Sequence, residues 1–315
     1  MTITADDVLV RARGLRKAYG DLEAVRGIDV DVRRGELFGF LGPNGAGKST
    51  TMRMVGTVTP RTGGDLSVLG REPNTDARAI KARLGVVPQE DTLDTELTVA
   101  QNLQVYGRYF GLSKAEINRR MEELLDFVQL ADRRDARVEA LSGGMKRRLT
   151  VARGLINEPE LVLLDEPTTG LDPQARHVLW DRLAQLRERG VTLILTTHYM
   201  DEAEQLCDRL VIMNEGVIIA EGSPQDLIAE HVAKEVVELR FRGEQAVDGD
   251  RIRTTLDGRA RNVDVVTDRA LVATDDGEAV QRAVEQSDLA PTGVLTRRAT
   301  LEDVFLALTG RQLIE

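Results

Sequence analysis

The spacing of apolar and polar residues changes along the chain and predicts an α/β fold. Short apolar runs separated by turn residues occupy the first 40 residues and indicate strands. Between 98 and 156 the period becomes helical. Ser113 and Glu116 fit a capping box there, and the apolar residues that follow lie on one helix face: Ile117, Met121, Leu124, Leu125 and Val128.

Two long apolar runs, 160–166 and 191–198, are typical of strands buried on both faces, as in a parallel sheet covered by helices. The helix between them has Asp172 as its expected N-cap, Pro173 as its first residue and Gly190 as its stop. Beyond about 232 the pattern restarts with short strands and helices. We therefore expect a first domain over 1–230 and a small α+β domain over 231–315.

Composition narrows the function classes. A net charge of −10 argues against non-specific binding of nucleic acid. The single cysteine, Cys207, excludes an internal disulfide framework and a zinc cluster of cysteines. No apolar run reaches the roughly 18–20 residues of a membrane span, and the first ten residues lack signal-peptide features. We expect a cytoplasmic protein whose membrane role comes through a partner.

A glycine-rich stretch, GPNGAGKST at 42–50, follows an apolar run and precedes a helix. The backbone N–H groups of such a loop converge on phosphate oxygens, and the helix adds its positive end. Lys48 is expected to reach the terminal phosphates of ATP, and the Ser49 hydroxyl to ligate Mg²⁺. The expected nucleotide contacts are Gly42, Pro43, Asn44, Gly45, Ala46, Gly47, Lys48, Ser49 and Thr50.

Two adjacent carboxylates, Asp165 and Glu166, end the first buried run. Because successive strand residues face opposite ways, we expect Asp165 to hold Mg²⁺ through water and Glu166 to polarise the water that attacks the γ-phosphate. A solvated strand exit is the alternative. His198 ends the second run and would reach the same rim, either as a γ-phosphate contact or as an ordinary packed or solvated histidine.

A second stretch, LSGGMKRRL at 141–149, also has the form of a phosphate cradle, because Ser142, Gly143 and Gly144 open a helix. A serine-capped helix start is the simpler interpretation of these three residues alone. The three basic residues that follow, Lys146 to Arg148, form either a solvated helix face or a contact with a partner or nucleotide.

The order of the motifs carries a family resemblance. Tyr19, the 42–50 loop, Gln89 in VVPQED, LSGGM, LVLLDEP, GLDP and TTHYMDEAE follow one another along the chain. Residues 8–230 resemble the ATP-binding subunit of an ABC transporter. The resemblance implies a P-loop NTPase fold with a mixed or parallel sheet core, an antiparallel β subdomain and a helical subdomain at about 91–157.

The resemblance also implies roles for single residues. Tyr19 would stack on adenine, and Gln89 would approach Mg²⁺ and the attacking water. Asp172 would lie where two subunits sense each other, and His198 would be the switch histidine. The alternatives are a strand aromatic, a solvated turn residue and a plain helix cap. In the family's head-to-tail dimer, the LSGG segment of one subunit closes on ATP held by the other; Met145 stands there where glutamine is common.

The leading hypothesis is the ATPase subunit of an ABC-2 type exporter of drugs or lipid-like molecules. It would act with a second ATP-binding subunit and a separate membrane permease, at the inner face of the membrane. Segment 90–135 would carry the permease groove, and Tyr106, Tyr109 and Phe110 either line it or, as we prefer, pack within the helices. An ATPase acting on nucleic acid or the ribosome, and an importer subunit, are the alternatives. For 232–315 we prefer a contact between subunits to regulation or permease binding, because short sheets have exposed edges.

Overall fold

The structure, a computed structural model, describes residues 7–241, 248–266 and 269–310. The outer ends of the two expected domains, 1–6 and 311–315, lie outside the described residues. By its internal contacts the chain divides into two compact units, Met1–Ile219 and Ala220–Glu315.

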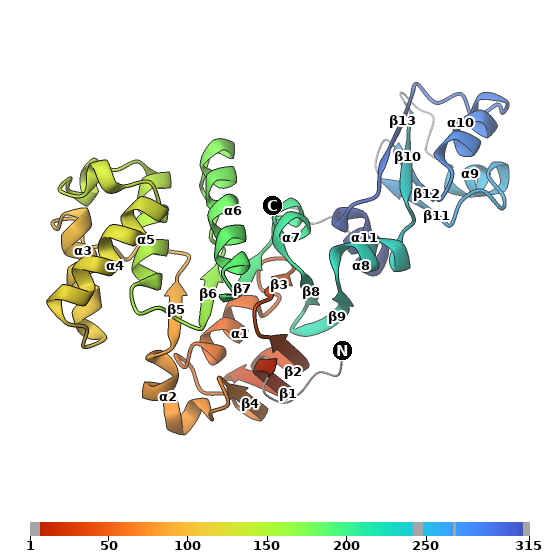
Figure 1. The fold of residues 1–315 in the computed structure, drawn as a ribbon. Helices are drawn as coiled ribbons and strands as arrows, with labels where there is room; N and C mark the ends of the chain where they lie inside the picture. Colours follow the sequence, from red (N-terminus) through yellow and green to blue (C-terminus); the bar gives the residue numbers. More distant parts are fainter. Residues whose placement is uncertain (1–6, 242–247, 267–268, 311–315) are drawn as a thin grey trace. The chain divides into compact units, whose positions relative to one another are not determined.

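A six-stranded sheet forms the centre of the first unit, in the order β5-β6-β7-β3-β8-β9 (Figure 1). The strands are β3 (Leu37–Leu41), β5 (Leu84–Val87), β6 (Leu161–Asp165), β7 (Thr192–Thr197), β8 (Arg209–Asn214) and β9 (Val217–Gly222). The first five strands in this order pair in parallel, so the predicted parallel sheet is confirmed. Leu41 lies opposite Thr197, and Thr196 opposite Asp165, so the carboxyl ends of β3, β7 and β6 meet at one edge.

An antiparallel sheet in the order β2-β1-β4 packs over the first helix. Its strands are β1 (Val8–Tyr19), β2 (Leu22–Arg33) and β4 (Gly63–Val68). Helix α1 (Lys48–Val55) contacts β2 on one side and β6 and β7 on the other. The main apolar core therefore lies between the two sheets and includes Phe38, Phe40 and Met54. Helix α2 (Pro73–Lys81) contacts β4 and β5.

Three helices pack against one another and form the helical group of the first unit: α3 (Val99–Tyr109), α4 (Lys114–Phe127) and α5 (Gly143–Leu155). Short 3-10 turns, η2 (Ala131–Arg133) and η3 (Val138–Ala140), connect α4 to α5. Ser113 caps α4, but the expected capping box is half formed, because the Glu116 carboxylate pairs with Arg120 instead of the cap backbone. Helix α6 (Pro173–Glu188) follows β6, and α7 (Met200–Leu206) contacts β3 and β7.

The second unit has the element order β-α-β-β-α-β. It comprises β10 (Glu235–Arg240), α9 (Gly249–Thr255), β11 (Asn262–Val266), β12 (Arg269–Thr274), α10 (Gly277–Glu285) and β13 (Gly293–Arg298), flanked by α8 (Pro224–His231) and α11 (Leu301–Thr309). The strands pair antiparallel in the order β11-β12-β10-β13. This is the split βαβ, ferredoxin-like arrangement, which leaves β11 and β13 as edge strands. None of the helices in the described part of the chain combines the length and apolar character that a membrane crossing requires.

Candidate nucleotide site

The loop between β3 and α1 requires glycine at the position where it enters the helix. Gly47 has a φ of 99°, and a Cβ there would stand 2.5 Å from the Ala24 carbonyl oxygen. Gly47 is also the N-cap of α1 and supplies no capping side chain. The first N–H groups of α1 are therefore available to an anion, as the loop motif predicts.

Lys48 lies across this loop rather than in solvent. Its Nζ donates to the carbonyl oxygens of Gly42 at 2.7 Å and Pro43 at 3.1 Å. The same ammonium lies 3.9 Å from Glu166 Oε1. Burial lowers the pKa of Lys48, while the charges of Glu166 and Asp165 act in the opposite direction. The structure thus holds a buried cation between the loop and the acidic end of β6.

Asp165 is the last residue of β6 and faces α1. Ser49 Oγ donates to Asp165 Oδ1 at 3.0 Å, and the Thr196 hydroxyl of the neighbouring strand donates to the same oxygen. A hydroxyl and a carboxylate side by side are hard oxygen ligands. They fit Mg²⁺, which usually takes one or two protein groups and completes its shell with water and phosphate.

The alternation of strand residues predicted that Glu166 continues the strand. In the structure it does not, since β6 ends at Asp165. Its φ is 43°, which is uncommon for a residue other than glycine, and its N–H donates to the backbone oxygen and hydroxyl of Thr196 at 3.1 and 3.0 Å. The backbone therefore turns out of the sheet at Glu166. Because of this turn the Glu166 carboxylate is directed to the same side as Lys48, although it remains only 7% exposed.

Glu166 is the point where the predicted catalytic residues meet. Gln89 Nε2 donates to Glu166 Oε2 at 3.1 Å, and Thr169 Oγ1 donates to the same oxygen at 3.2 Å. His198 Nδ1 lies 3.3 Å from Glu166 Oε1, outside hydrogen-bond geometry. The structure brings together Lys48, Gln89, Glu166 and His198 from four separate segments.

Tyr19 lies at the end of β1, with 45% of its surface exposed. The Lys17 ammonium stands 4.8 Å from the centre of its ring. An exposed ring of this kind is available for stacking on a base, so the adenine contact stays a prediction.

The second cradle lies apart from the first. Ser142 caps α5, accepting from the Met145 N–H at 3.3 Å, and Asp172 caps α6, accepting from the Ala175 N–H at 2.9 Å. Both caps line one hollow of about 290 Å³, together with Gly144 and Met145. None of the residues of the 42–50 loop lines this hollow. The structure therefore brings Ser142 and Asp172 together but does not join them to Lys48.

Two residues to which the sequence analysis gave no role in the catalytic group contact the site. Thr196 binds both Asp165 and the Glu166 backbone, as described above. Arg147, for which we expected either a solvated helix face or a contact with a partner or nucleotide, is instead buried and donates to backbone carbonyls near Glu166. Thr196 had a signal, since it lies two residues before His198 at the end of a buried strand. Arg147 had none.

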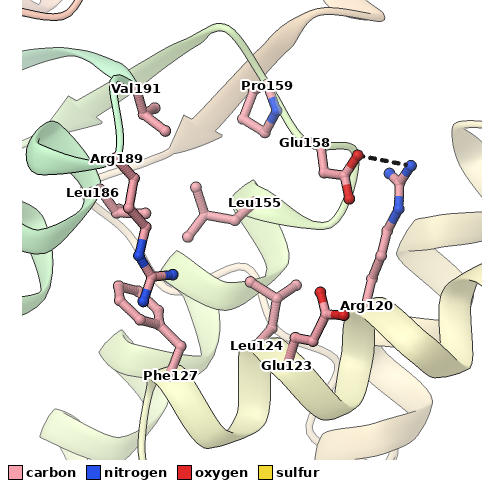
Figure 2. Close-up of a pocket in the computed structure, with 10 residues that line it drawn as sticks. All are labelled: Arg120, Glu123, Leu124, Phe127, Leu155, Glu158, Pro159, Leu186, Arg189 and Val191. Atoms are coloured by element: carbon pink, nitrogen blue, oxygen red, sulfur yellow. Dashed lines mark ion pairs between the residues drawn. The ribbon is translucent and has the colours of Figure 1, made fainter.

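A different hollow of about 230 Å³ lies between α4, the end of α5 and the end of α6 (Figure 2). Its walls are apolar, made by Leu124, Phe127, Leu155, Pro159, Leu186 and Val191. Its charged groups are engaged within the protein: Arg120 pairs with Glu158 at 3.2 Å, and the Arg189 guanidinium stacks on Phe127 at 4.9 Å. We interpret it as a packing space between helices, and no predicted site residue lines it.

Comparison with known proteins agrees with this geometry. Residues 25–169 match the ABC transporter family. In addition, the chain is 46% identical over 309 residues to the Nod factor export ATP-binding protein I of Ralstonia nicotianae, a match that covers 97% of this chain and 95% of the relative. The chain belongs to the ATP-binding proteins of ABC transporters and is an ATP hydrolase.

Within that class the similarity extends to the second unit. The Nod factor export ATP-binding protein I of Rhizobium meliloti is 48% identical over 307 residues, covering 97% of this chain and 89% of the relative. Residues 249–310 match the C-terminal domain of nodulation factor export protein NodI. The predicted family resemblance is confirmed.

Solved structures confirm the P-loop fold. The ATP-binding subunit of an ABC transporter superposes with a TM-score of 0.64 at 31% identity, covering 70% of this chain and 92% of that chain. A dimeric ATP-binding cassette in a post-hydrolysis state, bound to ADP and Pi, gives 0.63 at 26% identity, covering 68% and 98%.

Proposed function

We propose that the chain hydrolyses Mg²⁺-ATP as one of two identical subunits of an ABC-2 type exporter. The observation that carries the catalytic part is the buried carboxylate of Glu166, which lies 3.9 Å from Lys48 and accepts a hydrogen bond from Gln89. A carboxylate in this position can polarise a water for in-line attack on a phosphate held by Lys48.

We propose separate roles for the other side chains of the site. Lys48 and the α1 N–H groups would bind the β- and γ-phosphates, and the Gln89 amide would orient the Glu166 carboxylate and the water. His198, whose Nδ1 lies 3.3 Å from Glu166 Oε1, would contact the γ-phosphate. Bound Mg²⁺, held by Ser49 and Asp165 with Gln89 nearby, would neutralise phosphate charge as phosphoryl transfer requires.

The two-subunit part rests on the separation of the two cradles. Ser142, Gly143 and Gly144 open a helix beside Asp172 but lie away from the chain's own phosphate loop. In a head-to-tail pair with two-fold symmetry, each Ser142 cradle would close on the ATP of the other subunit. For the second unit we propose an added contact between copies along edge strand β13, where Val294 and Leu295 are exposed.

Two substitutions test the catalytic roles. Lys48→Ala removes the charge matched to the phosphates, so its Kd for ATP should rise by about 10-fold or more. Glu166→Gln keeps the charge of Lys48 and the loop, so its Kd should stay near the wild-type value while kcat falls by about 100-fold or more. Unchanged ATP affinity in the first variant, or wild-type turnover in the second, would contradict these assignments.

The export part rests on the relatives, whose names are those of export ATP-binding proteins. The partner would be a membrane permease that holds the chain at the inner face of the membrane. A hollow of about 310 Å³ lies beside Gln89, but Ser49 and Asp165 also line it, so it belongs to the proposed Mg²⁺ site. We therefore propose segment 90–135 as the surface for the permease's cytoplasmic segment. Tyr109 is exposed, which contradicts packing inside the helices for this ring.

Transport direction has a direct test. Membrane vesicles containing the chain and its permease should accumulate an amphiphilic drug or lipid-like substrate with ATP only when turned inside out, with Lys48→Ala as the inactive control. Accumulation in right-side-out vesicles would indicate an importer. A role on nucleic acid or the ribosome is not favoured by the relatives, and would show instead as ATPase stimulation by RNA or DNA.

A further inference from the structure

Arg147 is a buried residue next to the Gln89 and Glu166 segments of the first unit. It lies on α5, five residues after Ser142, and is only 8% exposed. Its guanidinium donates to three consecutive carbonyl oxygens where β6 ends: Nε to Pro167 at 2.6 Å, and Nη2 to Asp165 at 3.1 Å and Glu166 at 3.2 Å. The carbonyl groups on both sides of the Glu166 carboxylate are therefore held by this side chain, while Thr196 accepts from the Glu166 N–H.

The same guanidinium also holds the segment that carries Gln89. Nη1 donates to the carbonyl oxygen of Pro88 and, at 3.4 Å, to that of Gln89 itself. Arg147 thus connects three things: the helix opened by Ser142, the backbone of Gln89 and the backbone of Glu166. Only the planar, five-donor fork of arginine spans acceptors arranged in this way; a lysine ammonium is a point donor.

Among the residues that the structure describes, no carboxylate forms an ion pair with Arg147, which separates this arginine from an ordinary buried ion pair. Its hydrogen-bond acceptors are all backbone carbonyls. Burial lowers the pKa of Arg147 to about 10, while the more distant carboxylates of Glu202, Asp165 and Asp91 act in the opposite direction. Removing the Arg147 charge from water costs free energy, and neutral carbonyl groups compensate for it less than a carboxylate would. A role in fixing the backbone geometry therefore explains this arginine better than a contribution to stability does.

We propose that Arg147 is a positioning residue for ATP hydrolysis, which sets the Gln89 and Glu166 side chains in register with the helix that Ser142 opens. This proposal rests on the function proposed above. When the Ser142 end of α5 moves onto the partner's ATP, the guanidinium carries that movement to the carbonyls beneath Gln89 and Glu166. Each subunit's water-activating group is then placed only when its own signature helix is engaged.

The test compares Arg147→Lys with a matched control, Arg120→Lys, in the full chain. Arg120 is equally buried and also donates to a backbone carbonyl, that of Ile156 at 2.9 Å, but it lies on α4 and contacts neither Gln89 nor Glu166. We expect Arg147→Lys to keep its Kd for ATP near the wild-type value and to lose about 100-fold in kcat, because a misplacement of about 1 Å has that effect. Arg120→Lys should lower Tm about as much as Arg147→Lys does, but it should leave kcat near the wild-type value.

A second variant distinguishes a loss of turnover from a loss of folded structure. Arg147→Gln removes the buried charge and keeps one amide donor, so it should fold even if the lysine variant does not, with kcat again reduced and Kd unchanged. Wild-type kcat in either folded variant, a kcat loss matched by Arg120→Lys, or loss of structure in both Arg147 variants would assign Arg147 to stability alone and overturn the proposal. Failure of the proposed function is distinct, because it would show as full turnover in Glu166→Gln.

Discussion

Burial decides the charge of Glu202, an acid four residues beyond His198. The residue lies on α7 with none of its surface exposed, and its Oε1 accepts from Trp180 Nε1 at 3.2 Å. Burial raises the pKa of Glu202 above its ordinary value of 4.5, although the nearby hydroxyls of Thr197 and Thr168 and the hydrogen bond from Trp180 lower it in part. Since the unfolded chain ionises first, the folded state loses stability as pH rises from 4.5 to the raised pKa.

We predict that Glu202→Gln is more stable than wild type at pH 8, because glutamine can still accept from Trp180 and carries no charge. The gain should be about 1.4 kcal/mol for each unit by which the folded pKa is raised, and it should shrink as pH falls toward 5. Thermal unfolding followed by Trp180 fluorescence measures it. Glu204→Gln, at an exposed position of the same helix, is the matched control substitution.

A stability difference that is constant with pH would contradict a buried, shifted carboxyl at Glu202.

For single residues, the sequence predicts which side chains come together when their positions follow from motif spacing and from the ends of strands. Lys48, Gln89, Glu166 and His198 meet because each follows or starts an element whose register the apolar pattern sets. Arg147 could not be placed in the same way, because its acceptors are backbone carbonyls 18 to 59 residues away. Carbonyl positions depend on how the loops fold, and any residue type supplies them.

Among the elements, α11 of the second unit is held by a buried ion network. Arg297 on β13 forms two hydrogen bonds to Asp303 on α11, at 2.7 and 2.8 Å, and a third to Glu238 on β10, at 2.8 Å. Both carboxylates are buried. Glu238 also pairs with Arg269 at 3.4 Å, whereas the charge of Asp303 is compensated by Arg297. The helix and two strands of this unit therefore share one cation.

Replacing Arg297 by methionine should destabilise the second unit by about 3 kcal/mol, because it leaves Asp303 buried without its partner. The only tryptophan of the chain, Trp180, lies in the first unit, so its fluorescence reports that unit alone, whereas circular dichroism reports both. We expect an early transition in circular dichroism that fluorescence does not follow. Arg298→Met, at the exposed neighbouring position, should leave both signals near wild type.

If both signals shift together in Arg297→Met, the two units unfold as one.

The elements themselves were predicted unequally well. The long apolar runs required buried strands, and β6 and β7 are such strands. The second unit was predicted only as a mixture of short strands and helices. Short alternating strands fit several neighbours equally well, so their order, β11-β12-β10-β13, follows from tertiary packing and not from pattern.

At the scale of the whole molecule, the distance between the two cradles matters most. The phosphate loop and Lys48 face Asp165 and Glu166, while Ser142 and Asp172 line another hollow. In the pair proposed above, the Ser142 cradle of each chain would complete the ATP site of the other. The dimeric solved relative shows that a cassette of this fold can pair.

We predict that Glu166→Gln is a monomer without nucleotide and becomes a dimer when Mg²⁺-ATP is added, because slowed hydrolysis preserves the ATP that joins the subunits. Light scattering gives the mass in each state. Adding Ser142→Arg in the same background should allow ATP binding but keep the protein monomeric, since a bulky cation would replace the cradle. A monomer with ATP bound in Glu166→Gln alone would contradict the shared site, and a dimer before ATP is added would instead assign the pairing to the β13 edge.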